Sequence, residues 1–374
     1  MSDKKSISLA NSPAHHSKRK YIVRRLIPIE CARLQGFPDY WGYPDFKSEF
    51  TPEEESFWHE VRRVHALVNG KEYKPVKPGS LLKWYNKLHT DSAEYRMWGN
   101  GIALPCAEFV LGGIVEMLRS HSSNHDQVIT LGSLFDGSGG FPLAGAMHSV
   151  VPLWASEIEP YPIAVTRSRF PNMLHLGSVS DIRGFEIPPV DIITFGSPCQ
   201  DMSVAGKRAG MQHESKGDDN TTRSGLFYEA IRIISEMRES TNGKYPKYIV
   251  WENVPGAFSS NKGEDFFCVL KEICQIFEDE ISLPKPEGCK WSNAGEIVGN
   301  NGSVAWRILM RNIGESPNVA RESILSQILI WNVPEKYYLS AKMCLGILRR
   351  AEKRGKELPK LLLDALKEAV QLDV

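Results

Sequence analysis

The sequence has no charge bias, no long apolar run and no pair of closely spaced cysteines. Its 45 lysines and arginines are balanced by 45 aspartates and glutamates, which excludes a generally basic nucleic-acid-binding protein but permits a local basic face. No apolar run approaches the roughly 18 residues of a membrane span, and the first residues contain no apolar core of a secretory signal. The seven cysteines include no C-x-x-C pair, so reduced thiols in a cytoplasmic protein are expected rather than disulfides or a metal site.

Composition and patterning divide the chain into four segments. Residues 1–20 are polar and end in a basic cluster, which indicates a disordered basic arm. Residues 21–125 begin with a short strand-like run and contain a mostly helical stretch over 45–95. Residues 126–310 hold the most regular pattern, and residues 311–374 end in amphipathic helices rich in lysine and arginine. We therefore expect the main folded domain over the third segment, and the motifs described below indicate that it is the catalytic, cofactor-binding domain.

Short apolar strands alternate with helices in this central segment. The expected strands are 128–134, 153–156, 190–195, 248–251 and 303–309, and helices are expected from near residue 141 and over 161–168, 226–239 and 264–276. Such alternation is typical of βαβ units with right-handed crossovers. We therefore expect an α/β fold of the Rossmann type, in which a mostly parallel sheet carries helices on both faces.

A glycine-rich loop follows the first expected strand. The run Phe135–Gly140 reads FDGSGG, and an acidic residue, Glu157, closes the next strand about twenty residues later. Glycines at this point let a ligand approach the main chain, and a carboxylate at this spacing can bind ribose hydroxyls. The loop lacks the G-x-G-x-x-G spacing that cradles a pyrophosphate. This disfavours a dinucleotide-dependent oxidoreductase and favours S-adenosylmethionine as the cofactor.

A cysteine and a glutamate follow two other expected strands. Gly196–Gln200 reads GSPCQ and places Cys199 after the strand 190–195, while Glu252 begins the run ENVP after the strand 248–251. A cysteine by itself is more commonly a buried structural thiol. The carboxyl ends of parallel strands share one edge, however, so Cys199 and Glu252 can face one crevice. A thiol beside a carboxylic acid suits nucleophilic addition to an electron-poor ring that the acid protonates.

These runs together resemble motifs I, IV and VI of the DNA (cytosine-5) methyltransferases, and the run Arg223–Phe227 resembles motif V. Two further blocks match but are displaced, because Arg24–Pro38 resembles motif IX and Tyr95–Ala103 resembles motif X. In most of the family these two blocks come last, whereas here they come first. The chain is therefore similar to a circularly permuted member of the kind found in bacteria and their phages, and the resemblance extends over roughly residues 21–309.

The resemblance implies a DNA (cytosine-5-)-methyltransferase that uses S-adenosylmethionine. Cys199 would add to carbon 6 of a cytosine flipped out of double-stranded DNA, and Glu252 would protonate or hydrogen-bond ring N3 while carbon 5 takes the methyl group. The residues implied to bind the cofactor are Asn100, Gly101, Phe135, Gly137, Ser138, Gly140 and Glu157. Those implied to contact DNA, in the loop after the nucleophile, are Gln200, Ser203, Lys207 and Arg208.

The chain departs from the family pattern at two places. Ser178 stands where the family has an aspartate directed at the adenine amine, with Asp181 as the nearest substitute. The Gln-Arg-x-Arg segment of motif VIII, whose arginine holds the flipped cytosine, is missing after the last expected strand. Arg311 or Arg321 is a candidate replacement for that arginine, and the stretch 323–331 for the strand that accompanies it.

Two functions therefore remain open. The first is an active methyltransferase, and the second is a catalytically impaired or inactive remnant that binds DNA or cofactor without turnover. Target recognition is expected from either the basic C-terminal helices or residues 45–95. Double-stranded DNA is the expected partner of a cytoplasmic, monomeric protein that needs no membrane and no metal, and a cognate restriction endonuclease is a further candidate partner.

Overall fold

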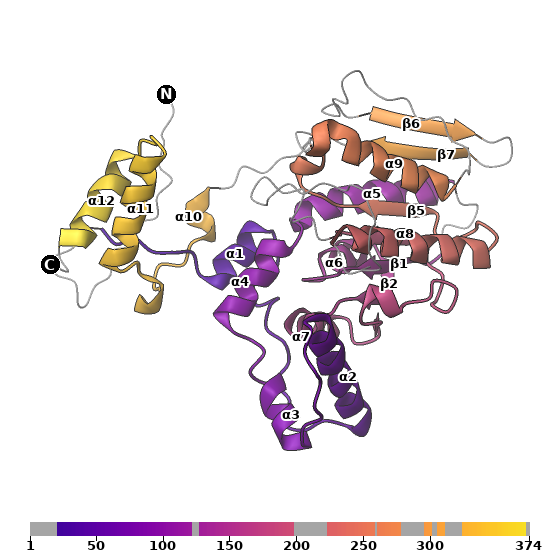
Figure 1. Cartoon of the computed structure of the whole chain (residues 1–374), viewed down its shortest axis with the longest axis horizontal. Helices are drawn as coiled ribbons and strands as arrows, with labels where there is room; N and C mark the ends of the chain where they lie inside the picture. Colours follow the sequence, from indigo (N-terminus) through magenta and orange to yellow (C-terminus); the bar gives the residue numbers. More distant parts are fainter. Residues whose placement is uncertain are drawn as a thin grey trace. The chain divides into compact units, whose positions relative to one another are not determined.

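A five-stranded, all-parallel sheet forms the centre of the larger of two compact units in the computed structural model (Figure 1). The structure describes residues 21–121, 127–197, 223–258, 260–277, 295–300, 305–310 and 324–371. The strands are β1 (Ile129–Leu134), β2 (Val150–Ser156), β3 (Leu174–His175), β4 (Ile192–Phe195) and β5 (Tyr248–Trp251), in the spatial order β3-β2-β1-β4-β5. This is the order of a doubly wound nucleotide-binding sheet, and it confirms the predicted α/β fold.

Helices cover both faces of the sheet, as predicted. Those of this unit are α2 (Pro52–Val68), α3 (Pro78–Tyr85), α4 (Asp91–Asn100), α5 (Leu104–Ser120), α6 (Gly140–Met147), α7 (Pro160–Arg169), α8 (Arg223–Ser240) and α9 (Glu264–Gln275), with 3₁₀ turns at Val179–Asp181, Pro255–Phe258 and Ser260–Gly263. Leu134 on one face packs against Phe227 of α8 and Val269 of α9. Gly145 of α6 lies against Leu131, whose side chain points to the opposite face because side chains alternate along a strand. α5 packs against α6.

Three details of the strands differ from the sequence prediction, which lacks both β3 and the strand Gly295–Asn300 and begins β2 too late. β3 was not predicted, because two residues cannot display a period of two. β2 starts at Val150, before the predicted start at residue 153. Pro152 pairs with Leu131 where the β1–β2 register shifts, and such an irregularity accommodates a proline that otherwise signals the end of a strand. An antiparallel pair, β6 (Gly295–Asn300) and β7 (Ala305–Met310), follows the sheet, and β7 coincides with the last predicted strand.

α2 and α3 form a helical layer on α7. The hydroxyl of Thr51 accepts the N–H of Glu54, so the sequence T-x-x-E acts as the capping box that starts α2. Trp58, Leu81 and Ile163 are buried together between the three helices. The stretch predicted to be mostly helical therefore packs beside the β3 edge of the sheet.

No single helix among the described residues is long and apolar enough to cross a membrane. α4 and α5 satisfy those criteria only when taken together, and they are bent by 43° at the break between them.

His175 of β3 is half-buried, and its two ring nitrogens, which are themselves buried, have no hydrogen-bond partner among the described residues. Burial, together with the Arg167 cation, lowers its pKa to about 4. In the unfolded chain the His175 side chain takes up a proton near pH 6.5, whereas in the folded chain it does so only near pH 4. The free energy of unfolding is therefore expected to fall as the pH drops from about 6.5 towards 4, by up to roughly 3 kcal/mol. Urea titrations across this range measure the loss.

A His175→Phe variant is the control for this prediction, because phenylalanine fills a similar volume and cannot ionise. Its stability is expected to change less between pH 7 and pH 5 than that of the parent chain. Identical pH dependence in the two proteins would show that the histidine does not titrate as described.

The smaller unit combines the two ends of the described chain. It consists of residues 21–42 and 324–371, with helices α1 (Pro28–Leu34), α10 (Leu325–Ile328), α11 (Ala341–Lys353) and α12 (Lys360–Gln371) and a 3₁₀ turn at Glu335–Tyr337. Glu30 is fully buried and accepts two hydrogen bonds of 2.8 Å from the guanidinium of Arg24. The same carboxylate accepts the N–H of Ile330 at 2.7 Å, 300 residues further along the chain. This paired buried charge ties the stretch that resembles motif IX to the C-terminal segment.

The stretch proposed to replace the motif VIII strand is not a strand where it is described. α10 occupies Leu325–Ile328 instead, and the Gln327 side chain accepts the N–H of Ile324 at its start. The prediction of a strand at 323–331 is therefore wrong for this part, because a local capping contact favours a helical turn.

Candidate catalytic and cofactor site

The carboxyl ends of four strands line up at one edge of the sheet. Leu134 pairs with both Ser156 and Phe195, and Phe195 pairs with Trp251. The residues that follow these four positions therefore emerge side by side. β1 and β4 are neighbours at the point where the strand order reverses, which is where sheets of this type bind ligands.

The glycine-rich loop turns sharply between β1 and α6. Phe135, Gly137 and Gly139 have left-handed backbones, with φ angles of 56°, 55° and 76°. Glycine adopts this conformation freely, whereas phenylalanine does so only when its surroundings hold it there. The N–H of Asp136 donates to the carbonyl of Ser156, and the N–H of Gly139 donates to the carbonyl of Asp136. The loop is therefore held in one backbone conformation beside the end of β2.

Glu157 holds this loop from the end of β2. Its Oε2 accepts the N–H of Gly137 at 2.9 Å, and its Oε1 accepts the N–H groups of Ile158 and Glu159 at 2.7 and 2.8 Å. Burial raises the pKa of Glu157, while these three backbone hydrogen bonds oppose that rise. A carboxylate has about four acceptor positions, so one remains for a ligand hydroxyl.

Asp136 is a further candidate residue of the site, and the spacing of the motifs does not predict it. Its side chain is only 8% exposed, and neither carboxylate oxygen has a hydrogen-bond partner among the described residues. Burial raises its pKa to about 7, although the nearby Ser133 hydroxyl lowers it, and the charge of Glu157 adds to the rise. A buried carboxyl group with unused acceptors is suited to N–H donors of a ligand. The signal in the sequence was an acidic residue within the glycine loop itself.

The segment that resembles motif X lies against the glycine loop. A methyl group added to Gly101 would come within 3.0 Å of the Ser138 hydroxyl and 3.2 Å of the Met97 carbonyl. The absence of a side chain at position 101 therefore permits this close approach. The structure thus brings together Gly101 and Ser138, two of the predicted cofactor residues, while the neighbouring Asn100 is exposed at the end of α4.

Glu252 lies directly beside the start of the predicted nucleophile loop. Its N–H donates to the carbonyl of Phe195 at 2.9 Å, and a Cβ added to Gly196 would come within 2.9 Å of its Oε2. The indole N–H of Trp251 donates to the hydroxyl of Ser197 at 3.3 Å, which fixes the next residue of that loop. Burial raises the pKa of Glu252. The protonated carboxyl, which a general acid requires, is therefore favoured at this position.

The predicted nucleophile and DNA-contacting residues lie outside the described residues. These residues are Cys199, Gln200, Ser203, Lys207 and Arg208. Their segment follows Ser197 at the end of β4 and precedes Arg223 at the start of α8. Arg311 and Arg321 also lie outside the description. Among the residues that are described, no group of three or more His, Cys, Asp or Glu side chains could hold a metal ion.

Comparison with known proteins finds a family match over the part of the chain that contains the sheet and the glycine loop. The model of the C-5 cytosine-specific DNA methylase family matches residues 129–280, which include the glycine loop, Glu157 and Glu252. The resemblance to the DNA (cytosine-5) methyltransferases is therefore confirmed over residues 129–280. The displaced order of motifs IX and X and the absence of motif VIII remain predictions.

The individual relatives include proteins named as Type II methyltransferases and a methyltransferase of a phage. The Type II methyltransferase M.Bsp6I of Bacillus sp. (strain RFL6) is 31% identical over 39% of this chain and 42% of its own length. The Type II methyltransferase M1.ScrFI of Lactococcus lactis subsp. cremoris is 28% identical over 70% of this chain and 64% of its own length. A protein of Escherichia phage P1 named DNA N-6-adenine-methyltransferase is 33% identical over 48% of this chain and 26% of its own length. The chain thus matches less than two thirds of each of these relatives.

Proposed function

We propose that this protein is a DNA (cytosine-5-)-methyltransferase that transfers a methyl group from S-adenosylmethionine to carbon 5 of a flipped cytosine in double-stranded DNA. The observation that carries the proposal is the close approach of the Glu252 carboxyl to Gly196. Glu252, an acid with a raised pKa, thus lies beside Gly196, which precedes Cys199 by three residues in the sequence, and both are within the part of the chain that matches the family.

The residues around the glycine loop fit S-adenosylmethionine. Asp136 offers two unused buried acceptors to a cationic N–H donor, and Glu157 retains an acceptor position for a ribose hydroxyl. Phe135, Gly137 and Gly140 would supply the wall of the pocket, with Ser138 and Gly101 closing it from the motif X side. When bound, S-adenosylmethionine supplies an electrophilic methyl group.

Cys199 and Glu252 would divide the activation of cytosine between them. The target base has to leave the duplex, because its ring is unreachable while it is stacked. The thiolate of Cys199 then forms a bond to carbon 6, and Glu252 gives a proton or a hydrogen bond to ring N3. This makes carbon 5 nucleophilic enough to take the methyl group. The transfer breaks the bond between the methyl group and the sulfonium sulfur and leaves a neutral thioether. Carbon 5 then loses its proton to water, the Cys199 thiolate leaves carbon 6, and a proton given to N3 returns to Glu252, which restores the aromatic ring as 5-methylcytosine.

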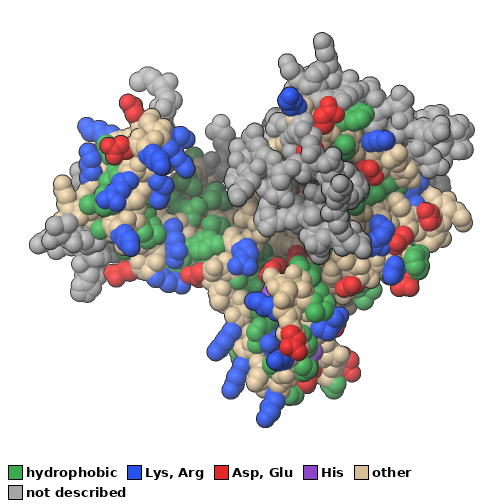
Figure 2. Space-filling model, in the orientation of Figure 1, with side chains coloured by type: hydrophobic (Ala, Val, Ile, Leu, Met, Phe, Trp, Pro, Cys, Tyr) green, Lys and Arg blue, Asp and Glu red, His purple; other side chains and the backbone are tan. Residues whose placement is uncertain are grey.

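DNA binding would involve the loop after the nucleophile and the smaller unit. Gln200, Ser203, Lys207 and Arg208 are the proposed contacts in the loop. Lysine and arginine side chains gather over α11 and α12 (Figure 2). Exposed members of this group are Arg349, Arg350, Lys353, Arg354 and Lys356. Such a face can follow DNA phosphates and makes binding sensitive to salt. We further propose that the protein acts as a monomer in the cytoplasm and that a cognate restriction endonuclease is a second partner.

One experiment distinguishes this function from the two alternatives, an adenine methyltransferase and an inactive remnant. The purified chain is incubated with labelled S-adenosylmethionine and DNA of varied sequence, and the DNA is digested to nucleosides for mass spectrometry. We expect 5-methylcytosine. N6-methyladenine instead would favour the activity named for the phage P1 relative. Cofactor or DNA binding without any methylated nucleoside would indicate the inactive remnant.

A substitution at Ser178, on the proposed adenine side of the pocket, is expected to increase the affinity for S-adenosylmethionine. It precedes the turn Val179–Asp181, and its hydroxyl accepts the N–H of Ser180 at 3.3 Å. Aspartate in its place can keep this capping bond and adds a charged acceptor for the adenine amine. Ser178→Asp is therefore expected to tighten S-adenosylmethionine binding about fivefold to tenfold, as measured by calorimetry.

The matched variant Asp181→Asn tests the alternative acceptor. If the exposed Asp181 carboxylate already serves the adenine, its loss weakens binding and Ser178→Asp gains little. Binding that is unchanged or weaker in Ser178→Asp would contradict the assigned position of Ser178.

A further inference from the structure

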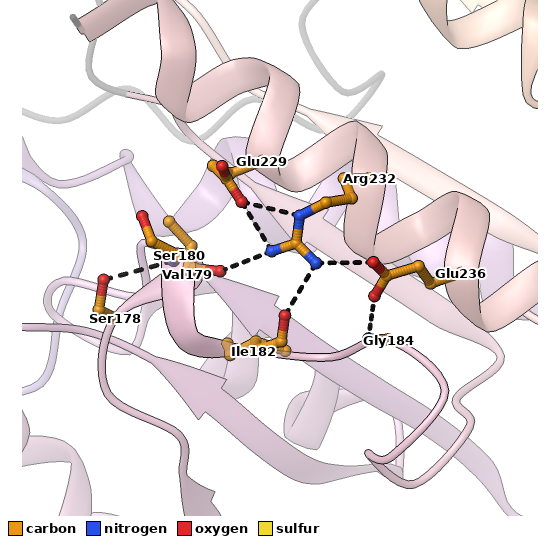
Figure 3. A network of polar contacts seen from close by, with 8 residues as sticks. All are labelled: Ser178, Val179, Ser180, Ile182, Gly184, Glu229, Arg232 and Glu236. Atoms are coloured by element: carbon orange, nitrogen blue, oxygen red, sulfur yellow. Dashed lines mark hydrogen bonds and ion pairs between the residues drawn. The ribbon is translucent and has the colours of Figure 1, made fainter. Parts of the chain in front are cut away.

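A single arginine of α8 uses all of its hydrogen-bonding capacity on one neighbouring segment and two glutamates (Figure 3). The Nη1 of Arg232 donates to the carbonyl of Ile182 at 2.9 Å and to Glu236 at 2.9 Å. Its Nη2 donates to the carbonyl of Val179 at 3.1 Å and to Glu229 at 2.6 Å, and its Nε donates to Glu229 at 2.9 Å. A guanidinium has five N–H donors in a fixed planar fork, and each of these hydrogen bonds takes one.

The second oxygen of Glu236 extends the network to the end of the same segment. It accepts the N–H of Gly184 at 2.6 Å. A Cβ added to Gly184 would fall 2.1 Å from the carbonyl of Ile233 and 2.8 Å from the Cβ of Glu236, so the segment lies directly on the backbone of α8. Residues 179–184 are therefore held against α8 by two carbonyls, one N–H group and direct packing.

This segment begins at the proposed cofactor pocket. Ser178 precedes it, and the carbonyl of Gly177 accepts the hydroxyl of Ser156 at 2.7 Å. Ser156 is the last residue of β2 and is followed by Glu157, so the start of the segment is tied to the strand end that carries the proposed ribose carboxylate. The helix on which it rests starts at Arg223, directly after the segment that contains Cys199.

We propose that Arg232 is a positioning residue for the cofactor pocket, which holds residues 178–184 against α8 so that Ser178 forms the adenine side of the pocket. This inference rests on the proposed function, because it assigns Ser178 to an S-adenosylmethionine site. Arg232 acts on the pocket through the backbone rather than by touching the ligand. It determines where the turn Val179–Asp181 lies, since that turn provides the carbonyl of Val179 to the guanidinium.

Lysine in place of Arg232 is the sharpest test, because it keeps the positive charge but replaces the planar fork by a single point of donation. An ammonium group cannot bind the carbonyls of Val179 and Ile182 in the way that the guanidinium does, so the Kd for S-adenosylmethionine measured by calorimetry is expected to rise about tenfold or more. In the methylation assay the KM for the cofactor should rise in parallel, while kcat at saturating cofactor stays within about twofold of that of the parent chain. If Arg232 had only a structural role, Arg232→Lys would lower the unfolding temperature but would not raise the KM for the cofactor while leaving kcat unchanged.

The control is Arg238→Lys, which alters an arginine near the C-terminal end of the same helix. Its guanidinium donates to the carbonyl of Pro246 at 3.0 Å, and Pro246 precedes the start of β5, at the edge of the sheet opposite the strand ends that form the proposed pocket. It should leave Kd and KM unchanged. If Arg232→Lys fails to fold, Glu236→Gln replaces it, because that change retains the side-chain shape but leaves one acceptor oxygen where the carboxylate offers two, to Gly184 and to Arg232. A rise in Kd of about threefold is then expected.

The outcomes separate this inference from the proposed function. Failure of the parent chain to bind S-adenosylmethionine overturns both. Normal binding by the parent, together with an unchanged Kd in folded Arg232→Lys or in Glu236→Gln, overturns the positioning role and leaves the methyltransferase proposal intact. A fall in kcat with unchanged Kd and KM also contradicts it, because the effect would then lie outside the cofactor pocket.

Discussion

Replacing Cys199 by alanine is expected to abolish methyl transfer, lowering kcat/KM by on the order of 10³-fold or more. Without the thiolate no bond forms to carbon 6, and carbon 5 of cytosine is then too poor a nucleophile to take the methyl group. Cofactor binding, measured by calorimetry, should remain within about twofold of the parent value, because the proposed cofactor residues lie at the ends of β1 and β2 and in the motif X segment. The rate is measured as 5-methylcytosine formed per enzyme under saturating cofactor.

The matched control for this variant is Cys268→Ala. Cys268 is an exposed free thiol on α9, and its removal should leave both rate and binding unchanged. Full activity of Cys199→Ala would exclude the covalent mechanism. Equal losses in both variants would instead indicate a general sensitivity of the chain to thiol replacement.

Glu252→Gln is expected to lower kcat by roughly 10²-fold to 10³-fold with little change in the KM for the cofactor. Glutamine has the shape of glutamate, so it can occupy the same space beside Gly196. It cannot give up a proton, however, and so the negative charge that develops on the cytosine ring is less well offset. Single-turnover measurements of methyl transfer give this rate without a contribution from product release.

The pH dependence of the rate distinguishes a proton donor from a spacer. Burial raises the pKa of Glu252, so its protonated form persists to higher pH than that of an exposed glutamate and is lost as the pH rises further. The rate of the parent chain should decline on the alkaline side as this proton is lost, and Glu252→Gln should lack that decline. Glu116→Gln, which changes an exposed glutamate on α5, is the control. An alkaline decline that persists in Glu252→Gln would assign it to another group.

The sequence predicts those candidate site residues that directly follow a strand, because the strand pattern itself shows where they lie. The glycine loop, Glu157 and Glu252 each follow an apolar strand, and the parallel arrangement of β1, β2, β4 and β5 places strand ends at one edge. Strand alternation thus indicates where the proposed cofactor loop and the proposed proton donor lie in the sequence. The same pattern could not reveal β3, which has two residues.

Contacts between distant segments were beyond the sequence analysis. Nothing in the local pattern links Arg232 to the carbonyls of Val179 and Ile182, which lie 53 and 50 residues earlier. The bond between Glu30 and the N–H of Ile330 is similarly invisible, because it depends on how the ends of the chain meet. Asp136 was overlooked for a different reason, since its importance follows from burial without a partner among the described residues rather than from spacing.

The central claim is that the Cys199 thiolate bonds to the target ring, and a covalent trap tests it most directly. DNA prepared with 5-fluorocytosine in place of cytosine blocks the last step, because fluorine cannot leave carbon 5 as the proton does. Incubation with S-adenosylmethionine, proteolysis and mass spectrometry should find the nucleotide attached to the peptide that contains Cys199, and no adduct in Cys199→Ala. If the parent chain methylates ordinary DNA yet forms no adduct, or forms one on a different residue, the account is wrong.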